Sequence, residues 1–333
     1  MRSFYIKKLG SQELGSPKAD GSVSRGRYLY ITKAYHDFFP FLSKTVTNDN
    51  VLIPIIPPFS NTKIYSTFVY HNDKYNVYGG TRDEFRLYLN KNLDPGRSYF
   101  HVNDILVFEK IETETPIPVY ILYRFNSTEA FYNDLSAIIA SSSIKGEHAL
   151  FTGELHYIPQ RKVNIDETVV VIPEEVMKVA VEQQNEVLAS EEQNIEDIRG
   201  ASLFRSDSFR DFVLHAYNYK CAITGKVIRH KNLLNLEAAH IQPKAQAGTF
   251  LPCNGIALCR DMHWAFDKGL ITLSDDLKII VHEEMKDSEL MEYNGKKIFT
   301  PVDPYFQPEK KFLNHHREKI FGLFLFSGSI RSE

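Results

Sequence analysis

The first 158 residues alternate between apolar and polar side chains with the period of two that is typical of β-strands. Turn residues such as Asn72-Asp73 and Pro95-Gly96 separate the alternating stretches, which are rich in Tyr, Phe, Val and Ile. One helix is predicted over 127–143, with Ser127 as its N-cap. Strands are predicted at 27–35, 62–71, 74–80, 84–90, 104–112, 118–125 and 149–158, and we expect them to form a twisted sheet or a partly open barrel.

The pattern changes between residues 159 and 200, where acidic side chains are frequent. Pro173 begins a predicted helix, acidic residues occupy its first turn, and Gly200 is a suitable C-cap. The apolar stripe of this helix is thin and consists of Val176, Val179, Val187, Ile195 and Ile198. Such a stripe is typical of a solvated linker helix, and a short dimerising helix is the alternative.

From residue 201 onward, helix and strand patterns are mixed. Residues 207–216 form an amphipathic helix pattern with Phe209, Phe212 and Val213 on one face. Strand-like runs lie at 236–240 and 255–259, with an Asn-Gly turn just before the second. A helix-like run at 260–269 and a strand pair at 270–282 follow. The sequence therefore predicts an α+β chain in three parts: a β-rich domain at 1–158, an acidic helical linker at 159–200 and a mixed domain at 201–333.

Length and composition are those of a cytoplasmic globular protein. The chain has 333 residues, enough for two domains with cores of their own. Its longest apolar stretches, at 51–59 and 320–326, are far shorter than the roughly 20 residues of a membrane-spanning helix, and no secretory signal is apparent. Three cysteines, an odd number, argue against a disulfide framework and for a reducing compartment.

Charge is unevenly distributed along the chain. Residues 165–200 contain ten acidic and two basic side chains, a net charge of −8, so the remainder carries +5 against the total of −3. The predicted folded domains are therefore mildly basic, which permits binding to DNA.

Four polar residues mark the ends of the predicted elements between 236 and 269. His240 ends the first strand and Asn254 precedes the second, whereas His263 and Asp267 lie one turn apart on the same helix face. Hydrolysis of a phosphodiester needs a deprotonated water and a divalent cation beside the phosphate. A strand-end histidine with a pKa near 6.5 can deprotonate the water, and a helical His-Asp pair can hold the cation.

The order His240, Asn254, His263 resembles the HNH endonuclease family. The segments YKCAITG (219–225), LEAAHIQP (236–243) and NGIALCRDMHWAFDKGLITL (254–273), with the tail from 293 to 321, are similar to the HNH domains at the C-termini of bacterial restriction endonucleases. The resemblance covers residues 209–333 and implies a ββα-metal fold.

The resemblance also implies a role for each residue of the motif. His240 would be the general base, His263 the principal metal ligand and Asn254 a brace for the loop. Asp267 would be the second helix ligand, although capping of the helix or an ion pair with Lys268 or Arg260 is the alternative.

Two departures from the family pattern affect metal binding. Ala239 stands where many relatives have a further ligand, and Glu237 is a weak substitute because strand alternation separates it from His240. We expect Mg²⁺ or Mn²⁺, because Mg²⁺ keeps several waters and uses substrate phosphate. Cys221-x-x-Thr224 and Cys259-x-x-Met262 each lack one cysteine of the zinc-binding pairs of relatives, so no structural zinc is expected. We expect apolar packing by Ile256, Leu258, Met262 and Trp264 to replace that zinc, with the two cysteines as small core residues.

The N-terminal block weakly resembles a DNA-binding pseudobarrel domain. The resemblance rests on RDEFRLYLN (82–90) and YFHVNDILVFEKI (99–111), with Asn103 where that family has Gly. A base-flipping domain that reads modified cytosine is the alternative. Candidate DNA contacts are Lys18, Arg25, Arg27, Lys91 and Arg97 in its loops and Lys244 and Arg260 beside the hairpin, with solvated side chains as the alternative. His315 and His316 are expected on a helix surface.

Together these features predict a restriction-type DNA endonuclease of bacterial antiviral defence. The N-terminal block would read sequence or modification in double-stranded DNA, because an HNH hairpin selects sequence poorly. One such site cuts one strand, so a homodimer is expected. The alternative is a non-cleaving DNA-binding regulator or defence sensor that uses the HNH fold as a scaffold.

Overall fold

The computed structural model describes residues 1–15, 27–73, 83–113, 117–144, 146–159, 161, 170–189, 206–230 and 233–324. The chain forms two compact units, Met1–Ala189 with Ile198–Leu203 and Ser190–Asp197 with Phe204–Glu333. Within the described ranges, every helix is too short or too polar to cross a membrane.

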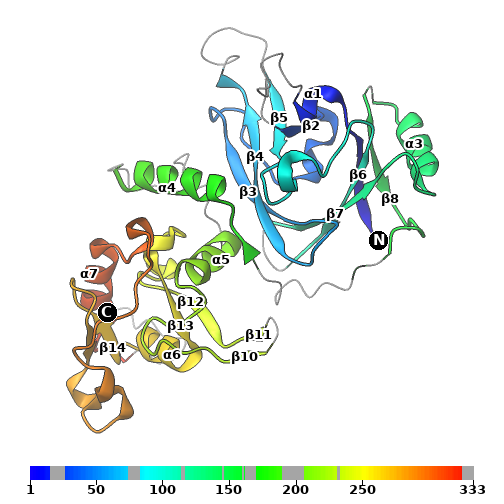
Figure 1. The fold of residues 1–333 in the computed structure, drawn as a ribbon. Coiled ribbons are helices and arrows are strands. Elements are labelled where there is room, and N and C mark those ends of the chain that lie inside the picture. The colour runs from blue at the N-terminus through cyan, green and yellow to red at the C-terminus, as the bar shows by residue number, and fades with distance from the viewer. Residues whose placement is uncertain are drawn as a thin grey trace. The chain divides into compact units, whose positions relative to one another are not determined.

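The N-terminal unit is built on one curved sheet (Figure 1). Its strand order is β2-β5-β4-β3-β7-β6-β1-β8, with β9 beside β4; β3–β7 and β4–β9 pair in parallel and the other neighbours are antiparallel. The strands are β1 Ser3–Lys8, β2 Tyr28–Ile31, β3 Asn50–Ile56, β4 Lys63–His71, β5 Glu84–Tyr88, β6 Ile105–Ile111, β7 Val119–Phe125, β8 His148–Thr152 and β9 Val170–Val171. The expected β-rich architecture is confirmed, and the strand expected at 74–80 lies outside the described residues.

Side chains on the two faces of this sheet enter two different cores. Tyr5, Phe108 and Tyr120 join a large aromatic cluster on one face. Phe4 and Ile121 point to the other face, where helix α3 (Tyr132–Ala140) covers β1, β6 and β8. The central strands are therefore buried on both sides.

Helix α3 begins later than the sequence predicts. Its N-cap is Phe131, and Ser127 lies in the preceding turn. The turn is held by Asn126, whose Oδ1 accepts hydrogen bonds from the backbone N and the hydroxyl of Thr128 at 3.0 and 2.6 Å. The shorter helices of this unit are α1 (Ser11–Leu14), η1 (Lys33–Phe38) and η2 (Pro95–Arg97).

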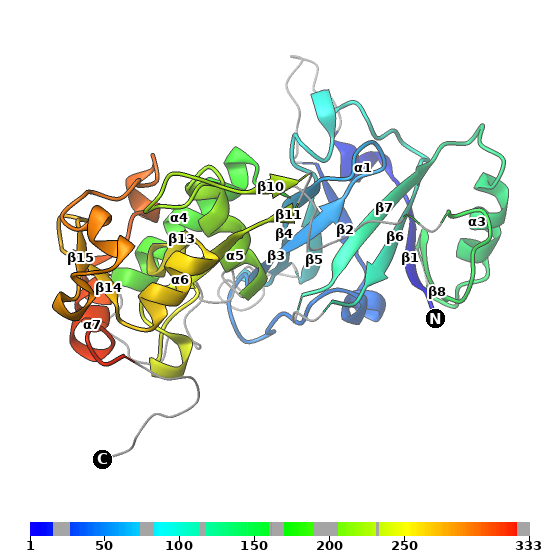
Figure 2. The same cartoon turned by 90° about the horizontal axis from the view of Figure 1, so that it is seen from below.

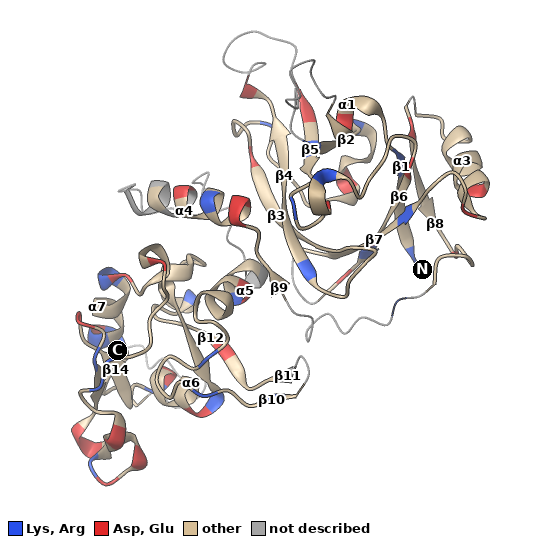
Figure 3. Cartoon of the chain, viewed as in Figure 1, with Lys and Arg blue, Asp and Glu red and all other residues tan. Residues whose placement is uncertain are grey.

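Helix α4 (Glu174–Ala189) packs on the N-terminal unit through its first half. Val176 and Ala180 are buried, and β9 immediately before the helix pairs with β4. The exposed residues of α4 are mainly acidic, with the single basic residue Lys178 among them (Figure 3). The described part of the predicted linker thus packs against the sheet instead of being wholly solvated, whereas the domain boundaries at 158 and 200 remain predictions.

The C-terminal unit consists of short strand pairs and helices (Figure 2). Two-stranded sheets are formed by β10 with β11, β12 with β13 and β14 with β15. The elements are α5 Ser206–Ala216, β10 Arg229–His230, β11 Leu233–Leu234, β12 Leu236–His240, η5 Lys244–Gln246, η6 Pro252–Asn254, β13 Gly255–Cys259, α6 Arg260–Asp267, β14 Ile271–Leu273, β15 Ile279–Val281, η7 Glu283–Met285, η8 Glu289–Tyr293, η9 Pro304–Phe306 and α7 Lys310–Lys319.

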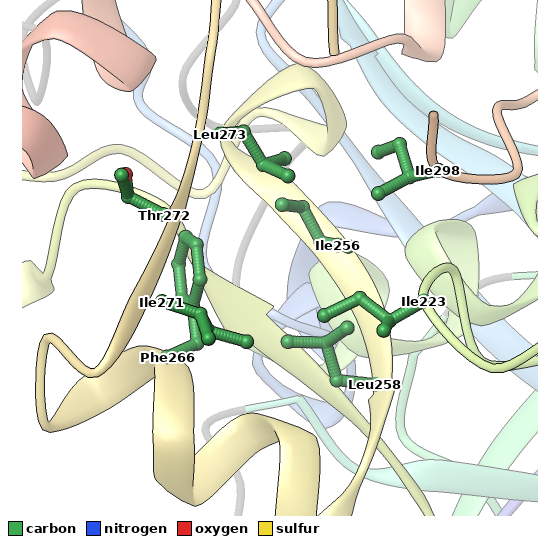
Figure 4. A pocket seen from close by; sticks show the side chains of 8 residues that line it. All are labelled: Ile223, Ile256, Leu258, Phe266, Ile271, Thr272, Leu273 and Ile298. Atoms are coloured by element: carbon green, nitrogen blue, oxygen red, sulfur yellow. The ribbon is translucent and has the colours of Figure 1, made fainter. Parts of the chain in front are cut away.

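An apolar core fixes α6 on the hairpin of β12 and β13. Phe266 of α6 meets Ile256 and Leu258 of β13, with Ile223 and Ile298 converging from the loops (Figure 4). Ile256 and Leu258 are buried as expected, but Trp264 is 60% exposed and Met262 is half-buried. The prediction for Trp264 is wrong because it lies about 200° around the helix from the buried Phe266.

His316 is part of this core, which corrects the expectation of a surface position. Its ring stacks on Phe266 with 3.7 Å between ring centroids, Nδ1 lies 2.9 Å from the hydroxyl of Thr272, and Nε2 lies 3.2 Å from the carbonyl of Phe266. His315 is half-buried, and its Nε2 lies 2.6 Å from Oε1 of Gln246. Both histidines therefore serve packing and loop attachment.

Candidate active site

Two paired strands and the helix after them carry the motif residues. β12 pairs with β13 in a register that sets His240 opposite Gly255, and α6 follows β13 directly. The predicted order of strand, strand and helix is confirmed. The connection is longer than an Asn-Gly turn, however: it spans 241–254 and includes η5 and η6.

The two faces of the hairpin contact different helices. A Cβ added to Gly255 would lie 2.4 Å from Cγ2 of Val213 and 2.8 Å from Cζ of Phe209, so the face of His240 and Gly255 is covered by α5. Glu237 lies on the opposite face by strand alternation and contacts α6. His240 is thus positioned by α5, and the helix residues of the motif are positioned from the other face.

His240 is held between aromatic rings. It stacks on Phe209 with 4.0 Å between centroids and 18° between planes, and Phe250 meets it edge-on at 5.5 Å. Its Nε2 is enclosed and has no hydrogen-bond partner among the described residues. Burial lowers the pKa of His240 to about 4, and electrostatic effects of Lys244 and His263 act in the same direction. The ring is therefore neutral near pH 7 and able to accept a proton.

His263 lies between two carboxylates. Its Nδ1 is 2.6 Å from Oε2 of Glu237, and its Nε2 is 3.3 Å from Oδ2 of Asp267, one turn along α6. Arg260 approaches the other oxygen of Glu237 at 3.3 Å. Burial raises the pKa of Asp267 and the carboxylate of Glu237 adds to this, while the charges of His263 and Lys268 oppose it.

Glu237 is the residue that sequence reasoning misses. Alternation does separate it from His240, but the face on which it lies is the one covered by α6. The only signal in the sequence is the spacing of Glu237 and Ala239 on one face of a strand whose partner helix carries His263.

Asn254 is fully buried and closes the loop between the strands. Its Oδ1 accepts from the backbone N of Gln242 at 2.9 Å, and its Nδ2 donates to the carbonyls of Gln242 at 3.1 Å and Thr249 at 2.9 Å. These bonds tie Gln242 and Thr249 of the loop to the residue before β13.

The donor set beside α6 fits a hard divalent cation. Among the described residues no group of three His, Cys, Asp or Glu side chains is arranged as a metal site. However, the 3.3 Å between His263 Nε2 and Asp267 Oδ2 is close to the spacing of about 3 Å between adjacent ligands of an ion with bonds of about 2.1 Å. Glu237 at Nδ1 is the type of contact that orients a metal-binding histidine. Ala239 is buried and adds no ligand.

The residues that resemble zinc ligands do not form a four-ligand set. Cys221 is buried and Cys259 half-buried, and they lie beside each other: burial, with a further contribution from Cys221, raises the pKa of Cys259. Thr224 donates its backbone N to Cys221 Sγ at 3.5 Å. With Thr224 and Met262 in the other two places, the donors needed for a tetrahedral zinc are missing.

The side chains predicted to contact DNA differ in their exposure and in their partners within the chain. Lys244 is exposed, with its Nζ 3.7 Å from the centroid of Phe250, whereas Arg260 is paired with Glu237. Arg27 is held inside the N-terminal unit by Asp94 and by the carbonyls of Leu14 and Phe100, which corresponds to a structural role. Lys91 and Arg97 are exposed and line a pocket, and Lys18 and Arg25 lie outside the described residues.

Comparisons with known proteins find a family model that matches the segment carrying this site. Residues 221–274 match the family model described as HNH endonuclease. Two solved structures are similar: a "Modification dependent TagI restriction endonuclease", at 23% identity over 37% of this chain and 41% of that chain with a TM-score of 0.28, and the "N-terminal domain of Helicobacter pylori LlaJI.R1", at 18% identity over 46% of this chain and 99% of that chain with a TM-score of 0.30. The chain thus spans less than half of the TagI structure. No match is found among curated proteins. The family match covers the segment from Cys221 to Ser274, which contains His240, Asn254, His263 and Asp267.

Proposed function

We propose that this chain is a restriction-type endonuclease that hydrolyses phosphodiester bonds of double-stranded DNA at its HNH site. The observation that carries the proposal is a neutral imidazole at His240, on which His263 acts electrostatically, together with the His263–Asp267 contact, within the segment that matches the family. A general base and a cation-binding pair are the two components that this hydrolysis requires.

His240 takes the proton of the attacking water in this scheme. Because Nε2 is enclosed by Phe209 and Phe250, the water binds at Nδ1. The stacked rings hold the imidazole in one orientation, and Asn254 holds the loop that follows it. A lowered pKa weakens the base but keeps it unprotonated.

His263 and Asp267 would hold a Mg²⁺ or Mn²⁺ ion. When bound, this ion supplies charge neutralisation at the scissile phosphate and the leaving oxygen. Glu237 accepts a hydrogen bond from Nδ1 of His263 and so fixes Nε2 toward Asp267. Lys244, exposed at the end of the hairpin, is suited to a phosphate contact.

The N-terminal unit is proposed to select the DNA. A hairpin that grips phosphates distinguishes sequences poorly, so specificity requires another surface. The curved sheet and the exposed Lys91 and Arg97 support this assignment. A digestion panel of plain, methylated and hydroxymethylated DNA distinguishes sequence readout from modification readout.

Cleavage of both strands is proposed to need two copies of the chain. One site of this kind cuts one strand, and a two-fold pair presents a site to each strand. Supercoiled plasmid should convert to the linear form with a rate that rises with protein concentration. Accumulation of nicked plasmid alone would instead indicate a monomeric nickase.

The decisive experiment compares plasmid cleavage by the native protein with that of His240→Ala. The native protein should cut with Mg²⁺ or Mn²⁺ and lose activity in chelator, while His240→Ala should bind DNA without cutting. His230→Ala, at an exposed histidine of β10, is the matched control and should cut normally. The buried Ala239 favours a second candidate, a non-cleaving DNA-binding regulator or defence sensor, which is supported if DNA binds but no metal permits cleavage of any substrate.

A further inference from the structure

The N-terminal unit contains a pocket of about 420 Å³ between its sheet and α4. Thr67, Val69 and Tyr88 line one wall, and they share the face of the sheet that is opposite to the aromatic core. Val176 and Val179 of α4 form the other wall. A volume within the roughly 300–1,000 Å³ of small-molecule sites makes this a binding pocket for a group of moderate size.

The mouth of the pocket is positively charged. Lys91 and Arg97 are exposed, and neither forms an ion pair with another described residue. Arg27 also lines the pocket, but its charge is balanced by Asp94. Glu175 is the one carboxylate in the lining, so the described walls keep a net positive charge. An anionic group such as a phosphate is therefore favoured at the mouth.

One residue of the lining carries an acceptor without a described partner. Oδ1 of Asn48, which lines the pocket, is enclosed and receives no hydrogen bond from a described residue. An enclosed polar atom without a partner costs free energy, and rotation of the Asn48 side chain toward the pocket would let a ligand N–H recover it. Glu175 is a second acceptor in the lining. Two acceptors favour a ligand that carries amino hydrogens.

We propose that this pocket binds a single nucleotide whose base carries an exocyclic amino group, with its phosphate at Lys91 and Arg97. Adenine, cytosine and guanine present such a donor and thymine does not. Tyr88 and Val69 offer the flat apolar surface that a base contacts. The nucleotide is either a free nucleotide or one extruded from a DNA duplex, and in the second case the inference rests on the proposed function.

The first test uses the full chain in chelator, so that no cleavage occurs. One arm titrates dAMP, dCMP and TMP by calorimetry. The other arm measures the fluorescence of a duplex that contains one mismatched 2-aminopurine, an amino-bearing base whose emission rises when it leaves the stack. Binding of dAMP or dCMP at least fivefold tighter than TMP identifies a free nucleotide as the ligand. A fluorescence rise without nucleotide binding identifies an extruded base.

Variants connect either signal to the pocket. Asn48→Gly removes the acceptor, and since Asn48 has a φ of 52°, glycine keeps the backbone unstrained. It should weaken binding by about tenfold. Lys91→Ala with Arg97→Ala should weaken it further. Lys8→Ala with Lys110→Ala removes the same charge from β1 and β6, outside the pocket lining, and should change little.

Thr67→Phe fills the pocket from β4, and it replaces Asn48→Gly in the binding test if Asn48→Gly lowers the melting temperature. Equal signals from the native protein and all pocket variants, or no signal in either arm, overturn the inference. Plasmid cleavage measured in parallel keeps the two proposals separate. Loss of both binding signals with normal cleavage contradicts the pocket alone, and normal binding signals without cleavage contradict the nuclease alone.

Discussion

At the scale of single residues, the two motif histidines differ because of their neighbours. His240 lies against Phe209 and Phe250, and burial among these rings keeps it neutral. His263 instead lies between the carboxylates of Glu237 and Asp267. Residue type and spacing single out these two histidines as candidates, but the division between an apolar and an acidic environment depends on which helix covers which face of the hairpin.

The environment of His240 predicts an unusual pH dependence of cleavage. Because its pKa is lowered to about 4, the unprotonated base is present at any pH well above that value. With saturating Mn²⁺, the single-turnover rate should therefore show no loss from His240 protonation between pH 7.5 and 5.5. Phe209→Leu removes the stacked ring and should move the acid limb upward, toward the ordinary value of 6.5. A native midpoint already at 6.5 would contradict the buried environment.

The bond from His263 to Glu237 predicts a metal-dependent defect. Glu237→Gln keeps the shape but removes the charge that, in the proposed site, orients and strengthens His263 as a metal ligand. Contacts of this kind typically change metal affinity by about 10–100-fold, so cleavage should fall at low Mg²⁺ and recover at high Mg²⁺. Asp261→Asn removes an exposed charge from the same helix and should leave the metal titration unchanged. A Glu237→Gln defect that no metal concentration restores would mean a role other than ligand orientation.

At the scale of elements, Gly255 controls the approach of α5 to the hairpin. An alanine Cβ there would lie 2.4 Å from Val213 and 2.8 Å from Phe209, so the helix must move. Gly255→Ala should lower the free energy of unfolding by about 1–3 kcal/mol and also reduce cleavage, because Phe209 shifts away from His240. Urea denaturation and plasmid cleavage measure the two effects.

A second substitution tests the steric cause. Val213→Ala removes the nearest methyl groups, so the Gly255→Ala, Val213→Ala double variant should be less destabilised than the sum of the single variants. Simple additivity would show that the glycine matters for another reason.

The elements differ in how far the sequence predicts them. Strands such as β6 and β7 have turn residues at both ends and strong β-formers between them, and these were predicted. β3 was missed, because all seven of its residues are buried and it therefore shows no alternation, and because it contains Pro54. Pro54 is paired with Tyr65 of β4, whereas on the side of β7 the pairing of β3 begins only at Ile55, so Pro54 lies outside that second ladder.

The contacts within the candidate site also follow only in part from the sequence. His240, Asn254, His263 and Asp267 follow from order and spacing, but Glu237 required knowledge of the packing. His316 was misassigned although a signal existed. His316 lies four residues after Phe312 and three after Leu313, both of which are buried. Helical spacing therefore places it on the inward face of α7. Because two adjacent polar residues favoured a surface position, this spacing of His316 was overlooked.

At the scale of the molecule, the buried histidines make the C-terminal unit sensitive to acid. Burial lowers the pKa of His316 to about 3 and that of His240 to about 4, from an ordinary value of 6.5. Below pH 6.5 the two histidines bind protons in the unfolded chain but remain neutral in the folded unit. The stability contributed by neutral burial is therefore complete above pH 6.5 and is lost progressively as the pH falls toward 3, by up to about 1.4 kcal/mol per pH unit for each histidine.

His316→Gln tests this account because glutamine does not titrate in the same range and retains hydrogen-bonding groups for Thr272. Urea unfolding of the C-terminal unit, followed from pH 7 to pH 4, should show a shallower loss of stability in the variant, by about one proton per molecule. His230→Gln removes an exposed histidine and should keep the native slope. Identical slopes for His316→Gln and the native protein would mean that His316 is protonated in the folded unit. The stacked ring and the carbonyl of Phe266 would then have to accommodate His316 as a buried cation.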